Sequence, residues 1–109
     1  MTNSTEQIST QSALIQLDAL LQHRSRLGAC VLLSTSDSLS FSKLKSLLGE
    51  TDGNLGAQLR KLEEANYVAV KKEFENRKPV SWYSLTAPGQ IALKAHLRAM
   101  QMLIHGAKV

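Results

Sequence analysis

Apolar residues recur at helical spacing through the N-terminal half of the chain. Leucines three or four positions apart predict a first helix over residues 12–23. A nearly uninterrupted apolar run, residues 27–33, predicts a second helix that is buried on most sides, with Ser25 available as its N-cap. Residues 1–11 are polar, and we expect them to form a flexible N-terminal arm.

Two further helices are predicted on either side of a tight turn. Ser42 caps a short third helix that Gly49 stops, and either Thr51 or Asp52 caps a fourth helix over residues 52–66. The apolar residues of the fourth helix form one narrow stripe, which consists of Leu55, Leu59 and Leu62. The rest of its surface is therefore free to contact something else.

The period changes from helical to alternating at residue 67. Residues 67–74 and 80–86 predict two strands, and the turn-rich segment 75–79 between them predicts a hairpin with a charged tip. Thr86 then caps a last helix that continues to about His105. The expected fold class is mainly α with a small β-hairpin, an α+β fold.

Length and composition are those of one globular domain, which we expect over residues 12–109. An apolar fraction of 43% with a charged fraction of 20% excludes the balance of a disordered chain. The longest apolar run is much shorter than the roughly 20 residues of a membrane-spanning helix. The polar N-terminal segment also lacks the pattern of a secretory signal, so a cytoplasmic location without membrane contact is expected.

The single cysteine and the histidines do not suggest a metal or redox site. Cys30 is the only cysteine and lies in the apolar run, so it predicts a buried structural thiol. His96 and His105 are nine residues apart, and no carboxylate follows residue 87. Because this is not a metal-ligand spacing, neither a metal nor another cofactor is expected.

The order of the predicted elements indicates a winged helix-turn-helix. Two helices joined by a tight turn are followed by a two-stranded ribbon with basic residues at its tip. In that architecture the second helix of the pair enters the major groove of DNA. Residues 52–66 would have this role.

Small and basic residues lie opposite the leucine stripe of the fourth helix. A step of about 100° per residue places Gly53, Ala57, Arg60, Lys61 and Glu64 on this face, with Asn54 beside them. Gly53 and Gly56 each cost roughly 0.5–1 kcal/mol relative to alanine, but they would allow the helix to approach a groove floor or a phosphate closely. Alternatively, Gly53 belongs to an irregular first turn and Gly56 packs against the neighbouring helix.

The polar side chains of this helix suit two kinds of contact. Asn54 and Gln58 can pair bidentately with adenine, although Gln58 could instead brace the helix pair. Arg60 and Lys61 suit phosphate contacts, or solvated ion pairs with glutamates about one helical turn away.

The hairpin tip carries Arg77 and Lys78. The net charge is +4, from 13 basic and 9 acidic residues, and the excess lies in the C-terminal half. A basic loop on a two-stranded arm can follow a phosphate backbone or insert an arginine into a minor groove. The alternative is a charged surface that protects an edge strand from pairing.

Three stretches of the chain resemble a known family. They are similar to winged-helix transcriptional regulators of the MarR and ArsR type, especially their small one-domain relatives. The stretches are HRSRLGACVLL in the second helix, FSKLKSLLGETDGNLGAQLRKLEEANYVAVKK through the helix-turn-helix, and WYSLTAPGQIAL, which begins in the second strand of the hairpin and continues into the last helix. The resemblance implies a DNA-binding homodimer on a pseudo-palindromic operator. Regulation by a small-molecule effector is left open.

The resemblance also implies positions for the DNA contacts. By position, the groove-facing residues would be Thr51, Gly53, Asn54, Gly56, Ala57 and Gln58, with Arg77 as the basic residue of the wing. Gly56 stands where many relatives carry serine, and Asn66 stands where many carry glycine. Asparagine tolerates the left-handed conformation that follows a helix, so the second departure is mild.

The terminal helices carry more apolar surface than one small lobe needs to cover. We therefore expect them to form a two-fold dimer interface. The candidate interface residues are Leu14, Leu17, Leu93, Leu97, Met100 and Ile104.

Two other classes of function are alternatives to DNA binding. No nucleophile, paired-carboxylate or phosphate-loop pattern stands out, so the chain is not expected to be an enzyme. A winged helix can also serve as a protein-interaction module, and the acidic residues Asp52, Glu63 and Glu64 near the fourth helix keep this alternative open.

Overall fold

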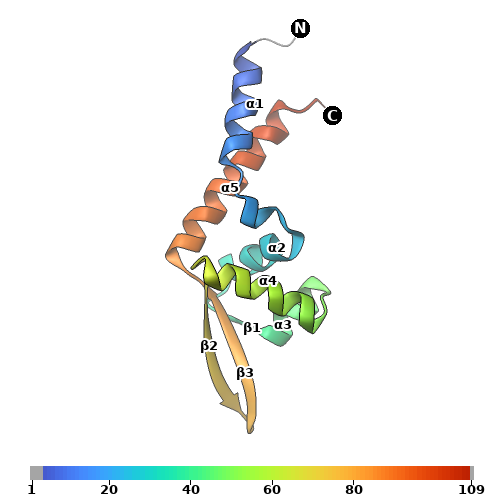
Figure 1. The fold of residues 1–109 in the computed structure, drawn as a ribbon, viewed down its shortest axis with the longest axis vertical. Helices are drawn as coiled ribbons and strands as arrows, with labels where there is room; N and C mark the ends of the chain where they lie inside the picture. Colours follow the sequence, from blue (N-terminus) through green and yellow to red (C-terminus); the bar gives the residue numbers. More distant parts are fainter. Residues whose placement is uncertain (1–3, 109) are drawn as a thin grey trace.

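The structure is a computed structural model that describes the backbone of residues 4–108 and the side chains of residues 9–108. It consists of a winged lobe and an arm of two helices. The arm consists of α1 (Ser4–Gln16) and α5 (Ala87–Gly106), which lie side by side beyond the lobe (Figure 1). The molecule is therefore elongated, with extents of 64 × 25 × 21 Å. None of the described helices is long and apolar enough to span a membrane.

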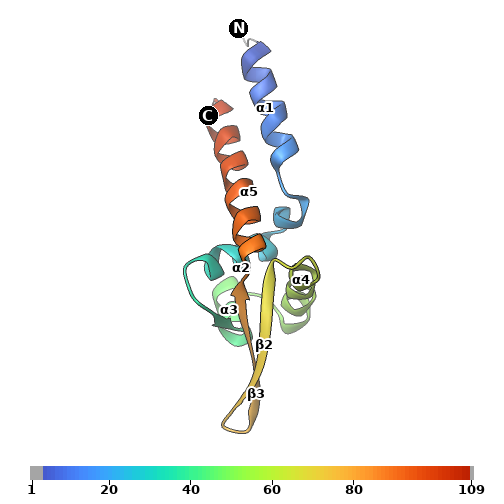
Figure 2. The same cartoon turned by 90° about the vertical axis from the view of Figure 1, so that its left-hand side faces the viewer.

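The lobe joins a helical layer to a small sheet. Its helices in chain order are the 3-10 helix η1 (Ala19–Gln22), α2 (Arg24–Ser34), α3 (Phe41–Leu48) and α4 (Asp52–Glu64). Its strands are β1 (Leu39–Ser40), β2 (Val68–Glu75) and β3 (Lys78–Leu85), in the antiparallel order β1-β3-β2. Beyond β1 the β2–β3 hairpin continues alone as a wing that projects away from the arm (Figure 2). The predicted winged helix-turn-helix is confirmed.

The wing turns through only two residues. Glu75 pairs with Lys78, and Asn76 and Arg77 between them have φ of 51° and 66°. Positive φ at both positions is the geometry of a type I′ hairpin turn, whose twist matches that of the flanking strands. The turn is thus shorter than the segment 75–79 expected from composition.

Several predicted helix ends are confirmed, and two predicted N-caps are wrong. Thr51 caps α4, Thr86 caps α5, and Gly49 ends α3 with φ 63°. The cap of α2 is the His23 side chain and not Ser25, and Ser40 rather than Ser42 caps α3. Each actual cap lies two residues earlier than the serine that the pattern favoured.

The first helix also differs from its prediction. It begins at Ser4, so residues 4–11 are helical where a flexible N-terminal segment was expected. Residues 1–3 lie outside the described part of the chain. It ends at Gln16, and a 3-10 turn follows where the prediction had one continuous helix. The polar start was misleading because α1 pairs with α5 along the arm rather than burying its whole surface.

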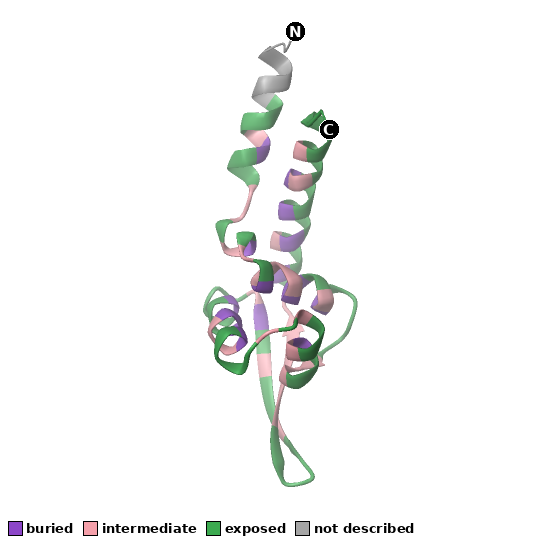
Figure 3. Ribbon diagram, turned by 90° about the vertical axis from the view of Figure 1, so that its right-hand side faces the viewer, coloured by how far each residue is buried: buried purple, intermediate pink, exposed green. Residues whose placement is uncertain are grey.

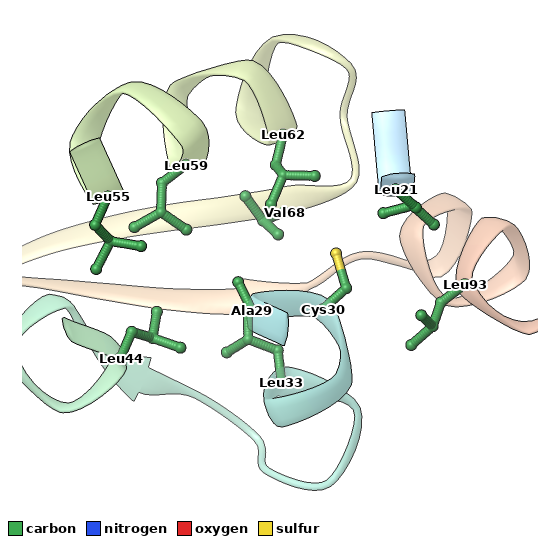
Figure 4. Packing of buried hydrophobic residues seen from close by; sticks show 10 residues of the cluster. All are labelled: Leu21, Ala29, Cys30, Leu33, Leu44, Leu55, Leu59, Leu62, Val68 and Leu93. Carbon is green, nitrogen blue, oxygen red and sulfur yellow. The ribbon is translucent and has the colours of Figure 1, made fainter. Parts of the chain in front are cut away.

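Ten buried apolar residues form the core of the lobe (Figure 4). They are Leu21, Ala29, Cys30, Leu33, Leu44, Leu55, Leu59, Leu62, Val68 and Leu93. The predicted burial of Cys30 is confirmed, and burial raises the pKa of its thiol to about 11, so it is protonated at neutral pH.

Asp18 connects the arm to the lobe. Its Oδ1 accepts a hydrogen bond from the Leu20 backbone N–H at 2.9 Å, and its own N–H donates to Nδ1 of buried His96 at 2.9 Å. The Tyr67 hydroxyl donates to Asp18 Oδ2. This hydrogen bond, together with burial, raises the pKa of Tyr67 to about 12. Asp18 thus joins η1 and the start of the wing through its carboxylate, and α5 through its backbone N–H.

Replacing Tyr67 by phenylalanine should therefore destabilise the protein. We expect the free energy of unfolding at neutral pH to fall by about 1.5–3 kcal/mol, the range for a hydrogen bond to a charged group. Since the pKa of Tyr67 is raised above its ordinary value of 10, its contribution is complete below pH 10 and is lost as pH rises toward 12. Urea unfolding of Tyr67→Phe should accordingly lose this pH dependence.

Tyr83→Phe is the matched control for this measurement. The hydroxyl of Tyr83 has no carboxylate hydrogen-bond partner within the described residues, so its removal should cost less. Equal losses from the two substitutions would contradict the role assigned to Asp18.

Candidate nucleic-acid interface

One side of α4 is buried and the other is exposed. The predicted leucine stripe is confirmed, because Leu55, Leu59 and Leu62 all lie in the core (Figure 4). The exposed residues on its other sides include four of the candidate contacts in this helix, and two more, Gly56 and Ala57, are partly exposed. The four are Gly53, Asn54, Arg60 and Lys61. Thr51, which caps the helix, is exposed as well.

Neither glycine of α4 is required by the fold. A Cβ atom placed on Gly53 or Gly56 meets no described atom within 4 Å, apart from the helix's own neighbouring backbone. Neither has a positive φ, and the helix is regular from Asp52 onward. The alternatives of an irregular first turn and of packing against a neighbouring helix are therefore wrong. Both positions are open to an approaching partner.

Gln58 does not join the exposed face. It is buried, and its Oε1 accepts a hydrogen bond from Arg26 Nη1 on α2. Arg26 Nε in turn donates to the Leu20 carbonyl at 2.6 Å. The structure thus supports the second of the two roles considered for Gln58, that of bracing the helix pair, and corrects its place among the groove-facing residues.

Asn54 is exposed but held in place. Its Nδ2 donates to Glu50 Oε2 at 2.7 Å, and its Oδ1 lies 3.5 Å from Gln58 Nε2. The same Glu50 oxygen accepts from the hydroxyl of buried Ser25. Sequence reasoning did not include Glu50 or Arg26 in the site. The spacing of Glu50, Asn54 and Gln58 by four residues was the available signal, whereas nothing local pointed to Arg26.

Arg60 and Lys61 are exposed, and the ion pairs expected with glutamates as an alternative are not observed. Among residues 9–108 the ion pairs are Lys45–Asp52 at 2.8 Å and Lys71–Glu73 at 3.1 Å. Both basic residues of α4 are thus available to an external anion.

The wing presents basic and apolar side chains to solvent. Arg77 and Lys78 are exposed at its tip, as Figure 3 shows for the whole end of the hairpin. Phe74 is 78% exposed and pairs across the hairpin with Pro79. Sequence reasoning did not single out Phe74, although strand alternation places it on the same face as Val68 and Val70. Its exposure follows because the helices do not cover the end of the wing (Figure 1).

Three of the predicted interface residues on the arm are exposed. Leu14, Leu97 and Ile104 are 55%, 41% and 68% exposed, while Leu17 and Met100 are partly buried. Leu93 was predicted to face a partner, but it is buried in the core of the lobe because α5 starts against that core. Further exposed apolar residues on the arm, not in the predicted set, are Ile15, Ile91 and Met102.

A hollow of about 450 Å³ lies between the arm and the lobe. Its walls include Leu17, Leu27, Met100 and the buried His96, and they are mainly apolar. Within the described part of the chain, no three His, Cys, Asp or Glu side chains are grouped as a metal site would require.

Known proteins resemble this chain in sequence or in fold. A curated relative, an uncharacterised protein of Methanocaldococcus jannaschii, is 33% identical over 72 residues, which are 66% of this chain and 78% of the relative. The solved structure of a transcriptional regulator homologue from Pyrococcus horikoshii OT3 has a TM-score of 0.79 at 25% identity, over 96% of this chain and 99% of that chain.

Two more distant structures share the fold. The Mycobacterium tuberculosis regulator MosR, solved in complex with DNA, has a TM-score of 0.65 at 18% identity, over 96% of this chain and 77% of its own. A MarR family regulator from Silicibacter pomeroyi has a TM-score of 0.59 at 18% identity, over 94% of this chain and 64% of that chain. The model of the winged helix DNA-binding domain family matches residues 25–104. Because this match covers most of the chain, the protein belongs to the winged helix DNA-binding domain family, a family of DNA-binding domains and not of enzymes.

Proposed function

We propose that the protein is a sequence-specific transcriptional regulator that binds a pseudo-palindromic DNA site as a homodimer. The observation that carries the proposal is the exposed side of α4, where two glycines leave open space that the fold itself does not use. A helix that enters a major groove benefits from such a bare surface, since backbone and short side chains can then approach the bases.

The charges around α4 support DNA over a protein partner. Asp52, which favoured a protein-interaction module, is paired with Lys45 at 2.8 Å. Glu63 and Glu64 lie at the other end of α4, away from the glycines. Arg60 and Lys61 have no ion-pair partner among the described residues, and they are suited to phosphates.

The wing provides a second contact in this proposal. Arg77 lies in a left-handed conformation, φ 66°, which costs a residue with a side chain roughly 1–2 kcal/mol. Glycine would adopt this conformation without that cost, so the fold does not explain an arginine at the tip. Contact with a phosphate or a minor groove would explain it, and the neighbouring Lys78 would add a second positive charge to that contact.

The arm would form the dimer. Its exposed leucines, isoleucines and methionine lie on two helices that project from the lobe, where the described chain does not cover them. A second copy related by two-fold symmetry would bury these residues and set two α4 helices about one DNA turn apart, roughly 34 Å. A cytoplasmic location stays a prediction, and regulation by a small-molecule effector stays open. The apolar hollow beside His96 is the place where such an effector would bind.

Alanine at the two glycines should separate stability from binding. Because alanine favours a helix, Gly53→Ala and Gly56→Ala should each raise the free energy of unfolding by about 0.5–1 kcal/mol. The added methyl group should weaken binding to the selected DNA site by roughly tenfold, about 1.4 kcal/mol. Chemical unfolding and fluorescence anisotropy measure the two effects.

Gly106→Ala is the control, since a Cβ there lies in ordinary contact with Thr10 Oγ1, 3.7 Å away at the end of the arm. It should leave DNA affinity unchanged. Unaltered affinity in both α4 variants would contradict close approach at these positions.

Arg77→Ala should weaken binding to every DNA sequence alike. A lost phosphate contact lowers the slope of log affinity against log salt by about 0.9 per contact, so the difference should shrink at high salt. Arg98→Ala, an exposed arginine on α5, is the matched control and should keep the slope. If the wild-type protein shows no salt-dependent binding to any fragment, DNA binding itself is disproved.

Leu97→Glu should dissociate the dimer. Glutamate at this position would bury an unpaired negative charge in the interface, so dimer affinity should fall on the order of tenfold or more. Light scattering gives the mass, and Leu47→Glu, at a half-exposed leucine of α3, should remain dimeric. A mass unchanged by Leu97→Glu would rule out the arm as the interface.

A further inference from the structure

A chain of hydrogen bonds links α4 to two adjacent residues of α2, and the backbone between those two residues closes it into a ring. From Ser25 the ring passes to Glu50 in the turn, then to Asn54 and Gln58 on α4, and returns to Arg26. Ser25 and Arg26 are neighbours near the start of α2, and Arg26 is itself held by the Leu20 carbonyl. Both ends of the ring are therefore fixed to the lobe.

The Glu50 carboxylate and the Arg26 guanidinium determine which way each amide points. An ionised carboxylate can only accept hydrogen bonds and a guanidinium can only donate them. Gln58 must therefore turn its oxygen toward Arg26 and its nitrogen toward Asn54. Asn54 must in turn direct its oxygen toward Gln58 and its nitrogen toward Glu50. A flipped Asn54 would place its carbonyl oxygen against the Glu50 carboxylate.

The ring leaves part of the Asn54 amide unused. An amide has two N–H donors and two lone pairs on its oxygen, and the ring takes one of each. One N–H donor on Nδ2 and one lone pair on Oδ1 therefore remain on this exposed residue. An adenine in the major groove presents the complementary pair, the N7 acceptor and the N6 amino donor.

We propose that Glu50 and Arg26 are positioning residues, which hold the Asn54 amide in one orientation so that α4 selects adenine at one position of each half-site. This inference rests on the proposed function, because it names the specificity of the same surface. Glu50 does not contact the base in this arrangement. Its carboxylate near DNA opposes affinity in general and favours discrimination.

The experiment begins with selection of preferred sites from a random DNA library by the wild-type protein. Asn54→Ala should lose the adenine preference at one position, on the order of tenfold for a bidentate contact, while other positions keep theirs. Glu50→Gln should reduce the same preference, because a carboxamide can donate as well as accept and no longer fixes the ring. Its affinity for non-specific DNA should stay the same or rise, since a negative charge is removed.

Glu64→Gln is the matched control, with the same change of charge at an exposed site on α4. It should not alter base preference. If Glu50→Gln changes base preference no more than Glu64→Gln does, Glu50 is not a positioning residue. If the wild type selects a sequence but Asn54→Ala preserves every preference, this inference fails while the proposed function stands. A wild type that selects no sequence disproves both.

A second measurement does not depend on the variants folding or on DNA. In the free wild-type protein, the Asn54 side-chain amide should exchange its protons with solvent more slowly than that of exposed Gln101 in nuclear magnetic resonance spectra. Equal exchange rates would show that the ring does not hold Asn54.

Discussion

Leu55, Leu59 and Leu62 lie along one side of α4 and pack into a core that α2, α3 and β2 also form. Burying a leucine contributes roughly 1.5–3 kcal/mol, so this stripe fixes how α4 is rotated about its axis. Because the stripe is narrow, the rest of the helix stays outside the core. The open glycines and the exposed basic residues of α4 are consequences of this one contact.

Polar contacts refine the arrangement that the leucines set. Asp18 joins η1, α5 and Tyr67, and the ring through Glu50 and Gln58 joins the turn and α4 to α2. Hydrophobic burial is non-directional, so it does not by itself fix the angle of a side-chain amide or the angle between arm and lobe. Hydrogen bonds between groups with fixed donor and acceptor roles do so.

Much of the fold was predictable because its signals are local. The change of period at residue 67, the cap at Thr51 and the stop at Gly49 depend on residues within a few positions of each other. The errors at α2 and α3 were of two residues each: at α3 Ser40 caps the helix in place of Ser42, and at α2 the cap is a histidine, His23, in place of Ser25. The start of α1 was missed because its support comes from α5, far away in the chain.

The sequence by itself determined the order of helices and strands, the buried stripe of α4 and the basic tip of the wing, since spacing and turn chemistry depend on near neighbours. Only the tertiary structure decided that Gln58 turns inward and that both glycines face open space. It also decided that Leu93 belongs to the core. These outcomes depend on contacts such as Arg26 with Gln58, 32 residues apart, and Asp18 with Tyr67, 49 apart. Periodicity carries no information about such partners, because packing of the whole chain brings them together.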